Sequence, residues 1–145
     1  MVEAKTHLNS ATKRKLLKEI KKLQTGDTSE RLTSNNKSLK LYLCAKYNVG
    51  PVEEIAVHHI NLDYNDYRPV NIALVYSSEH SKAHVKALTG AINSVLSLRN
   101  ITNKAIHNLR IEDLSEDEIR LIYEIYFNAM QEWLNTGGNI IHNLV

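Results

Sequence analysis

The chain has 145 residues, of which 43% are hydrophobic and 23% are charged, and its formal net charge is +2. This length suits one domain with a core of its own, and the composition excludes a disordered or fibrous chain. The single cysteine, Cys44, excludes an internal disulfide and a cysteine-based metal cage. No apolar run reaches the ~20 residues of a membrane span, so we expect an intracellular, cytoplasmic protein without membrane association.

The charge is distributed unevenly along the chain. Residues 1–50 carry 11 Lys and Arg against 4 Asp and Glu, whereas residues 101–145 carry 3 against 7. A basic first third favours a polyanionic partner, with nucleic acid as the first candidate. A solvated helix face is the simpler alternative for a basic helix taken alone.

The first predicted helix covers residues 11–24. Leu16, Ile20 and Leu23 form a narrow apolar stripe on it, and cations cover much of the remaining surface. The cations that we expect to bind nucleic acid are Lys13, Arg14, Lys18, Lys21 and Lys22.

The next segments are a loop and a second helix. Residues 25–37 are rich in turn-forming residues and predict a loop. In residues 38–47 the leucines alternate as in a strand, yet their spacing also fits a helix. We favour a helix, with Ser38 as its N-terminal cap.

Two short strands and a long helix are predicted in the middle of the chain. Residues 54–60 have strand character, residues 61–70 predict a loop, and residues 71–76 form a second strand. A serine then caps a helix over residues 77–98, which can bend at Gly90.

The last helix has the clearest local signals. Ser115 and Glu118 form a capping box, Leu114 and Ile119 can form a hydrophobic staple, and Gly137 with its neighbouring glycine ends the helix. Its wide apolar face predicts a core helix, and a homodimer interface is the alternative use of that face. The residues of the face are Ile119, Ile122, Tyr123, Tyr126, Met130, Trp133 and Leu134.

Four histidines are concentrated in the two strands and the helix that follows them. His80 and His84 are four residues apart, which places both imidazoles on one helix face with Cβ atoms roughly 5–6 Å apart. His58 and His59 are neighbours at a strand end, so their side chains point to opposite sides. One of them can therefore bind a metal while the other acts as a base. Neutral imidazole is a good ligand for Zn²⁺ or Ni²⁺.

Residues 57–84 resemble the HNH nuclease motif, also called the ββα-metal finger. Three features match in order and spacing: the His-His pair, an Asn before a short apolar strand, and an E-H-S-x-x-H helix start. The resemblance implies an α+β, mostly helical fold, in which two short strands plus a helix are embedded among flanking helices. We expect a single domain over residues 1–145, with a basic helical extension (1–50), the ββα core (52–98) and a C-terminal helical extension (99–145).

The resemblance also implies a role for each matching residue. His58, His80 and His84 would bind one divalent ion, which could be Zn, Ni, Mn or Mg. His59 would be the general base, and Asn71 would clamp the loop that holds this base. The implied activity is hydrolysis of DNA phosphodiester bonds, by nicking or by double-strand cleavage, in a protein similar to phage-type members of the family.

The chain departs from the family pattern in the loop between the strands. Asn61 replaces a common Asp, and Asp66 and Tyr67 replace an Asn pair. The family commonly uses an arginine to bind the scissile phosphate, and the nearest cations here are Arg68 and Lys82. These changes affect the expected loop geometry more than the expected chemistry.

A non-catalytic alternative uses the same metal ligands. A DNA-binding, regulatory or accessory module could keep the finger as a metal-stabilised scaffold without cleaving DNA. Such a module needs the three ligands but no base, so the presence of His59 favours the enzyme.

Overall fold

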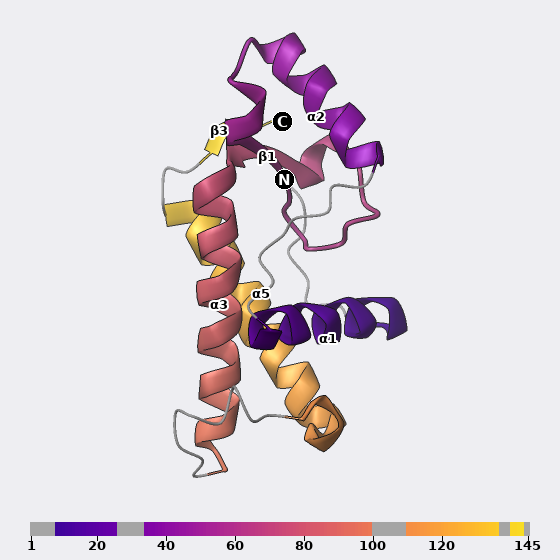
Figure 1. Ribbon diagram of the computed structural model, residues 1–145, viewed down its shortest axis with the longest axis vertical. Coiled ribbons are helices and arrows are strands. Elements are labelled where there is room, and N and C mark those ends of the chain that lie inside the picture. Colours follow the sequence, from indigo (N-terminus) through magenta and orange to yellow (C-terminus); the bar gives the residue numbers. More distant parts are fainter. Residues whose placement is uncertain (1–7, 26–33, 100–109, 137–139, 144–145) are drawn as a thin grey trace. The chain divides into compact units, whose positions relative to one another are not determined.

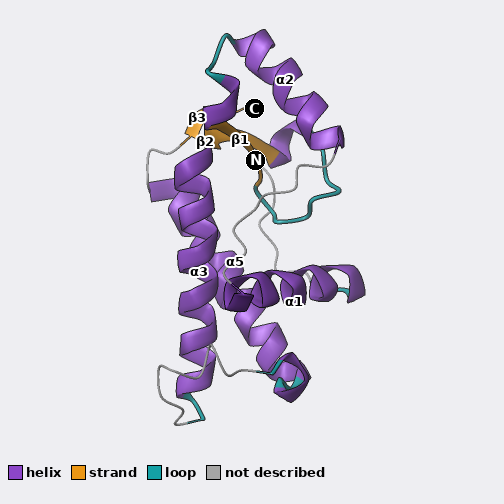
Figure 2. Cartoon of the chain, viewed as in Figure 1, coloured by secondary structure: helices purple, strands orange, loops and turns teal. Residues whose placement is uncertain are grey.

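The computed structural model describes residues 8–25, 34–99, 110–136 and 140–143 (Figures 1 and 2). The predicted α+β, mostly helical fold is confirmed. Within the described ranges, no helix is both long and apolar enough to cross a lipid bilayer. The helices are α1 (Ser10–Thr25), α2 (Ser34–Tyr47), α3 (Ser77–Ser97) and α5 (Glu116–Thr136), and the strands are β1 (Ile55–His59), β2 (Ile72–Tyr76) and β3 (Ile140–Asn143).

The three strands form one antiparallel sheet in the order β1-β2-β3. His58 lies opposite Ala73, and His59 lies opposite Ile72 at the end of the β1–β2 ladder. The two predicted strands are confirmed, although Glu54 and Asn71 belong to short 3-10 turns that precede β1 and β2. The third strand was not predicted, because four residues after a glycine pair carry too little periodicity to signal a strand.

The chain divides into two compact units. One unit contains the described residues 34–83, 131–136 and 140–143, and therefore α2 and the sheet; the other contains 8–25, 84–99 and 110–130, and therefore α1. Helices α3 and α5 contribute residues to both units. The predicted extensions do not follow this division, since α1 and α2 belong to different units.

Helix α2 covers one face of the sheet (Figure 1). Leu43 and Cys44 pack against Ile55, Ile72 and Leu74, which alternate along β1 and β2 and are all buried. Burial raises the pKa of the Cys44 thiol. This residue therefore acts as a small packing side chain, as its apolar surroundings in the sequence predict.

The other face of the sheet packs against the C-terminal end of α5. Ala56, Ala73 and Val75 are buried there together with Leu134. The two faces of β1 thus have different neighbours. Because the side chains of His58 and His59 point to opposite faces, their surroundings also differ.

Helix α2 begins four residues earlier than predicted. The predicted loop over residues 25–37 is wrong for Thr25, which ends α1, and for residues 34–37, while residues 26–33 lie outside the described part of the chain. Ser38 lies inside α2 instead of capping it. Ser and Asn favour turns but also favour the first positions of helices. The polar residues that begin at Ser34 therefore resemble a loop in the sequence, although they form the start of α2. Beyond the helix, Asn48 has a φ of 53°, a left-handed conformation typical of the residue after a helix.

Helix α5 begins with the predicted capping box. The Ser115 amide donates to Glu118 Oε1 over 2.9 Å, and the Glu118 amide donates to Ser115 Oγ over 3.1 Å. Arg99 forms an ion pair with the same glutamate and lowers its pKa. Leu114 and Ile119 are both buried, as the predicted staple requires. Gly137 and its neighbouring glycine lie outside the described residues.

The apolar face of α5 is largely core. Ile122, Tyr123, Tyr126 and Met130 are buried within the chain, which accounts for most of the face without a second copy. The homodimer interface stays a prediction. Trp133 differs from the rest, because it is only half-buried.

Replacing Ser115 by alanine should lower the free energy of unfolding by about 0.5–2 kcal/mol, because an N-terminal cap would be lost. Urea denaturation measures this change. The matched control is Ser94→Ala at an exposed position within α3, which should change the free energy by less than about 0.5 kcal/mol. Equal effects of the two substitutions would show that the capping box adds no stability.

Candidate metal and base site

The structure brings together the three predicted metal ligands. His58, at the end of β1, has 1% of its surface exposed, and its Nδ1 lies 3.1 Å from Nε2 of His80 on α3. His84 follows His80 by about one turn of the same helix. Each of the three histidines offers one ligand atom, and these atoms all lie within 4.8 Å of one another.

This arrangement fits one metal ion. An ion about 2.05 Å from two imidazole nitrogens with tetrahedral angles holds those nitrogens about 3.3 Å apart. The observed 3.1 Å between His58 and His80 is close to this separation. All three ligand atoms lie within 4.8 Å of one another, so small adjustments of the side chains are sufficient for one ion to contact all three. The donor set consists of three neutral nitrogen ligands, which can hold a divalent ion without cancelling its charge.

Two aromatic side chains of α5 contact these histidines. The Trp133 ring lies edge-on to His58, with 5.6 Å between ring centroids, and its centroid is 6.2 Å from that of His80. The Tyr126 hydroxyl forms a hydrogen bond with Nδ1 of His84. We predicted only core roles for Tyr126 and Trp133. Their spacing of seven residues, which puts both on one helix face, was the available signal.

His59 faces different neighbours from His58. Its ring contacts the rings of Tyr64 and Tyr67 edge-on, with centroid distances of 5.7 and 5.2 Å. Its Nδ1 lies 3.1 Å from the backbone carbonyl oxygen of Asp66. A carbonyl oxygen only accepts hydrogen bonds, so Nδ1 carries the proton, and the lone pair of the neutral ring is on Nε2. Sequence reasoning missed both tyrosine contacts.

Asn71 ties together the two ends of the loop between β1 and β2. Its side chain is fully buried; its Oδ1 accepts from the Asn61 amide over 2.8 Å, and its Nδ2 donates to the Asp66 carbonyl over 2.9 Å. Its own carbonyl accepts from the Ile60 amide. The carbonyl that orients His59 is thus the one that Asn71 fixes, which is the geometry that a loop clamp needs.

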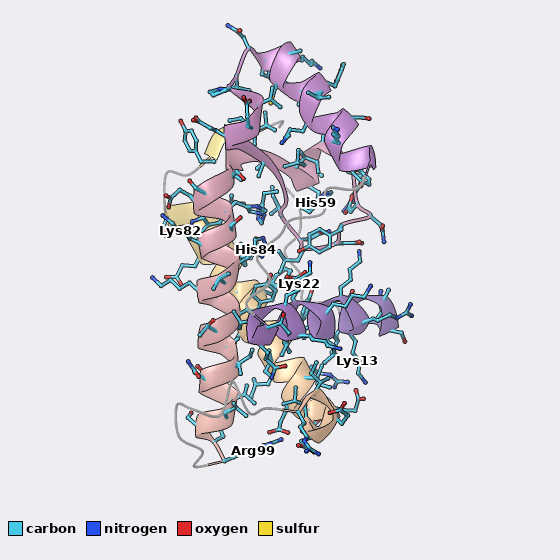
Figure 3. All side chains as sticks on the ribbon, viewed as in Figure 1. Lys13, Lys22, His59, Lys82, His84 and Arg99 are labelled. Carbon is cyan, nitrogen blue, oxygen red and sulfur yellow. The ribbon has the colours of Figure 1, made fainter. Side chains whose placement is uncertain are left out.

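The carboxylate of Asp66 is bound from two sides. Arg68 donates to it from Nε and Nη2 over 2.9 and 2.6 Å, and Asn61 Nδ2 donates over 3.0 Å. Mainly because of the Arg68 hydrogen bonds, the pKa of Asp66 is lowered to about 2. Arg68, predicted as a phosphate ligand, therefore shares its charge with a carboxylate of its own loop. Lys82, the other candidate, projects from α3 with 77% of its side chain exposed (Figure 3).

The cations of α1 differ in how they are engaged. Lys13 forms an ion pair with Glu116, and Nζ of Lys22 lies 3.5 Å from Oε1 of Glu19. Arg14, Lys18 and Lys21 are exposed. Helix α1 belongs to the compact unit that does not contain His59, so its contribution to DNA binding has to be measured separately.

Comparisons with known proteins do not assign a family or a function to this chain. A scan against protein-family models finds no match, and searches of curated proteins and of solved structures find no similar protein.

Proposed function

We propose that this protein is a metal-dependent endonuclease of the HNH type, which hydrolyses DNA phosphodiester bonds. The observation that carries the proposal is the contrast between two neighbouring residues at the end of β1. His58 joins a cluster of three imidazoles, whereas His59 has its Nδ1 held by a backbone carbonyl. A divalent ion can stabilise charge on the phosphoryl oxygens, and an oriented imidazole can activate water, so the two together supply what hydrolysis of a phosphodiester uses.

His59 supplies the base in this proposal. With its proton on Nδ1, the neutral ring accepts the proton of an attacking water at Nε2. The water oxygen forms the new bond to phosphorus, the bond to the 3′ oxygen breaks, and that oxygen takes a proton from solvent. The products are 5′-phosphate and 3′-hydroxyl ends. The Asp66 carbonyl keeps the ring in one orientation and stabilises its protonated form through the Nδ1 hydrogen bond.

His58, His80 and His84 would hold the divalent ion. When bound, such an ion supplies charge stabilisation for the phosphoryl oxygens and for the leaving oxygen. Three nitrogen ligands favour Zn²⁺ or Ni²⁺ in binding strength, whereas Mg²⁺ prefers oxygen ligands and Mn²⁺ lies between them. The ion that binds most tightly need not be the one that gives the highest rate.

DNA is the proposed partner, and the exposed cations of α1 are expected to supply part of the non-specific affinity. Each phosphate neutralised adds about 0.9 to the slope of log affinity against log salt concentration. A Lys18→Gln, Lys21→Gln double variant should therefore lower this slope by up to about 1.8. Fluorescence anisotropy with a labelled duplex at several salt concentrations measures the slope.

Lys13→Gln is the matched control for this experiment, because Lys13 is already paired with Glu116 on α5. Its removal should change the slope by much less than the value of about 0.9 expected for one phosphate contact. If the Lys18, Lys21 double variant also leaves the slope unchanged, α1 does not contact DNA.

Incubation of purified protein with supercoiled plasmid tests the proposed activity. We expect conversion to open-circular or linear DNA with at least one of Zn²⁺, Ni²⁺, Mn²⁺ and Mg²⁺, and no conversion with a chelator. DNA binding and metal binding without cleavage under any of these ions would favour the non-catalytic, metal-stabilised module instead.

A further inference from the structure

Asp66 takes part in two separate sets of hydrogen bonds, one through its backbone and one through its side chain. Its carbonyl accepts from His59 Nδ1 and from Asn71 Nδ2. Its carboxylate accepts from the fork of Arg68 and from Asn61 Nδ2. The carboxylate also accepts from the Arg68 amide over 3.2 Å, which closes a tight turn around Tyr67. This residue therefore links a surface arginine to the buried histidine.

We infer that Arg68 is a positioning residue for His59, which it orients through Asp66, and that it is not a phosphate ligand. The inference rests on the proposed function, since it assigns Arg68 a task in presenting the proposed base. It replaces the role that the family resemblance favours for the nearest arginine.

The geometry of the pair supports a positioning role. Two parallel hydrogen bonds from a planar guanidinium fix the carboxylate in distance and in orientation, which a single lysine ammonium cannot do. With the side chain held by Arg68 and the carbonyl held by Asn71, Asp66 is anchored at both of its polar ends. The Nδ1 proton of His59 then meets an acceptor in a fixed position.

The same turn places an aromatic ring beside the base. Tyr67 lies between Asp66 and Arg68, and its ring is edge-on to that of His59 at an interplanar angle of 83°. Tyr67 has 37% of its surface exposed. The bridge from Arg68 to Asp66 thus restrains two of the contacts that define the His59 ring, one to the carbonyl and one to the tyrosine.

Exposure and charge argue against a phosphate contact. The Arg68 side chain is 66% exposed, whereas that of its partner Asp66 is 12% exposed. The Arg68 hydrogen bonds lower the pKa of Asp66 to about 2, so the carboxylate is ionised near neutral pH and pairs with the Arg68 charge. Because the Arg68 side of the pair is exposed, the pair is expected to add little to the free energy of unfolding.

Arg68→Lys and Arg68→Ala separate the two roles. The lysine variant keeps the positive charge but loses the two parallel hydrogen bonds of the guanidinium. If residue 68 bound a phosphate, this variant would therefore keep most of its DNA binding. We expect kcat to fall about 10- to 100-fold in both variants, because a small misplacement of a catalytic group is enough for such losses. KM and the salt dependence of DNA binding should stay within about two-fold. Arg120→Ala, at an exposed arginine of α5, is the control and should leave both constants unchanged.

Nitrogen-15 NMR of the His59 ring tests the inference without DNA. In the wild type, the ring should be a single tautomer with its proton on Nδ1. In Arg68→Lys and in Asp66→Asn the ring should become a mixture of tautomers, and the metal affinity should not change. This readout remains valid even if the protein cleaves no DNA, so it can fail independently of the proposed function.

A double variant completes the test. If Arg68 acts only through His59, adding Arg68→Lys to His59→Ala should cause no further loss of rate. A rise in KM and a lower salt slope with unchanged kcat would overturn the inference, because Arg68 would then bind DNA. An unchanged His59 tautomer in all Arg68 and Asp66 variants would overturn it as well.

Discussion

His59→Ala is expected to lower the rate of DNA cleavage by about 10²- to 10⁴-fold, which is the usual contribution of a positioned general base. The reason is that the lone pair of the ring lies on Nε2 while Nδ1 is held by the Asp66 carbonyl. Neither metal affinity nor DNA affinity depends on that lone pair, so both should stay within a few-fold. Single-turnover cleavage of supercoiled plasmid at saturating metal measures the rate.

Added imidazole is the control for this variant. His59 is 2% exposed, so its removal leaves a space of about the size of the lost ring. Partial recovery of the rate with millimolar imidazole would show that a missing base caused the loss, and not a distorted loop. Cleavage at the wild-type rate by purified His59→Ala would remove His59 from the mechanism.

The second large effect is expected for metal binding. A His80→Ala, His84→Ala double variant keeps only the His58 imidazole of the three, so its affinity for Zn²⁺ or Ni²⁺ should fall by at least two orders of magnitude. Isothermal titration calorimetry measures the affinity. His59→Ala is the matched control, because it removes an imidazole adjacent to His58 in the sequence but outside the cluster. Undiminished affinity in the double variant would exclude this metal site.

Local signals in the sequence were sufficient for most elements of the fold. The stripe of Leu16 and Ile20 predicted α1, and both residues are buried. The capping box at Ser115 predicted the start of α5, and its two hydrogen bonds are present. These features depend on residues within one or two turns of each other, so the chain itself encodes them without help from tertiary contacts.

Features that depend on distant segments could not be predicted in the same way. Strand β3 pairs with β2 from the far end of the chain, and four residues give no periodic signal by themselves. The contact of Trp133 with His58 needs the end of α5 to reach the sheet, a long-range arrangement that the helix pattern does not specify.

The candidate metal ligands could be predicted from the sequence, but most of the residues that hold them and His59 in place could not. The spacing of His80 and His84 on one helix and the alternation of His58 and His59 on one strand are local facts. The role of Asp66 was not visible, because the acceptor for His59 is a backbone carbonyl, which every residue has. Arg68 and Lys82 were only the nearest candidates for a phosphate ligand, because the sequence does not show that Arg68 contacts the Asp66 carboxylate.

The proposed division of roles between a metal ligand and a base is tested by the dependence of cleavage rate on metal concentration in the wild type, His58→Ala and His59→Ala. These neighbours on β1 are assigned opposite roles. His58→Ala should shift the midpoint of the metal dependence at least ten-fold upward, since a ligand is lost. His59→Ala should leave the midpoint in place and lower the plateau by about 10²-fold or more. Equal shifts of the midpoint in both variants, or wild-type curves for both, would contradict the account.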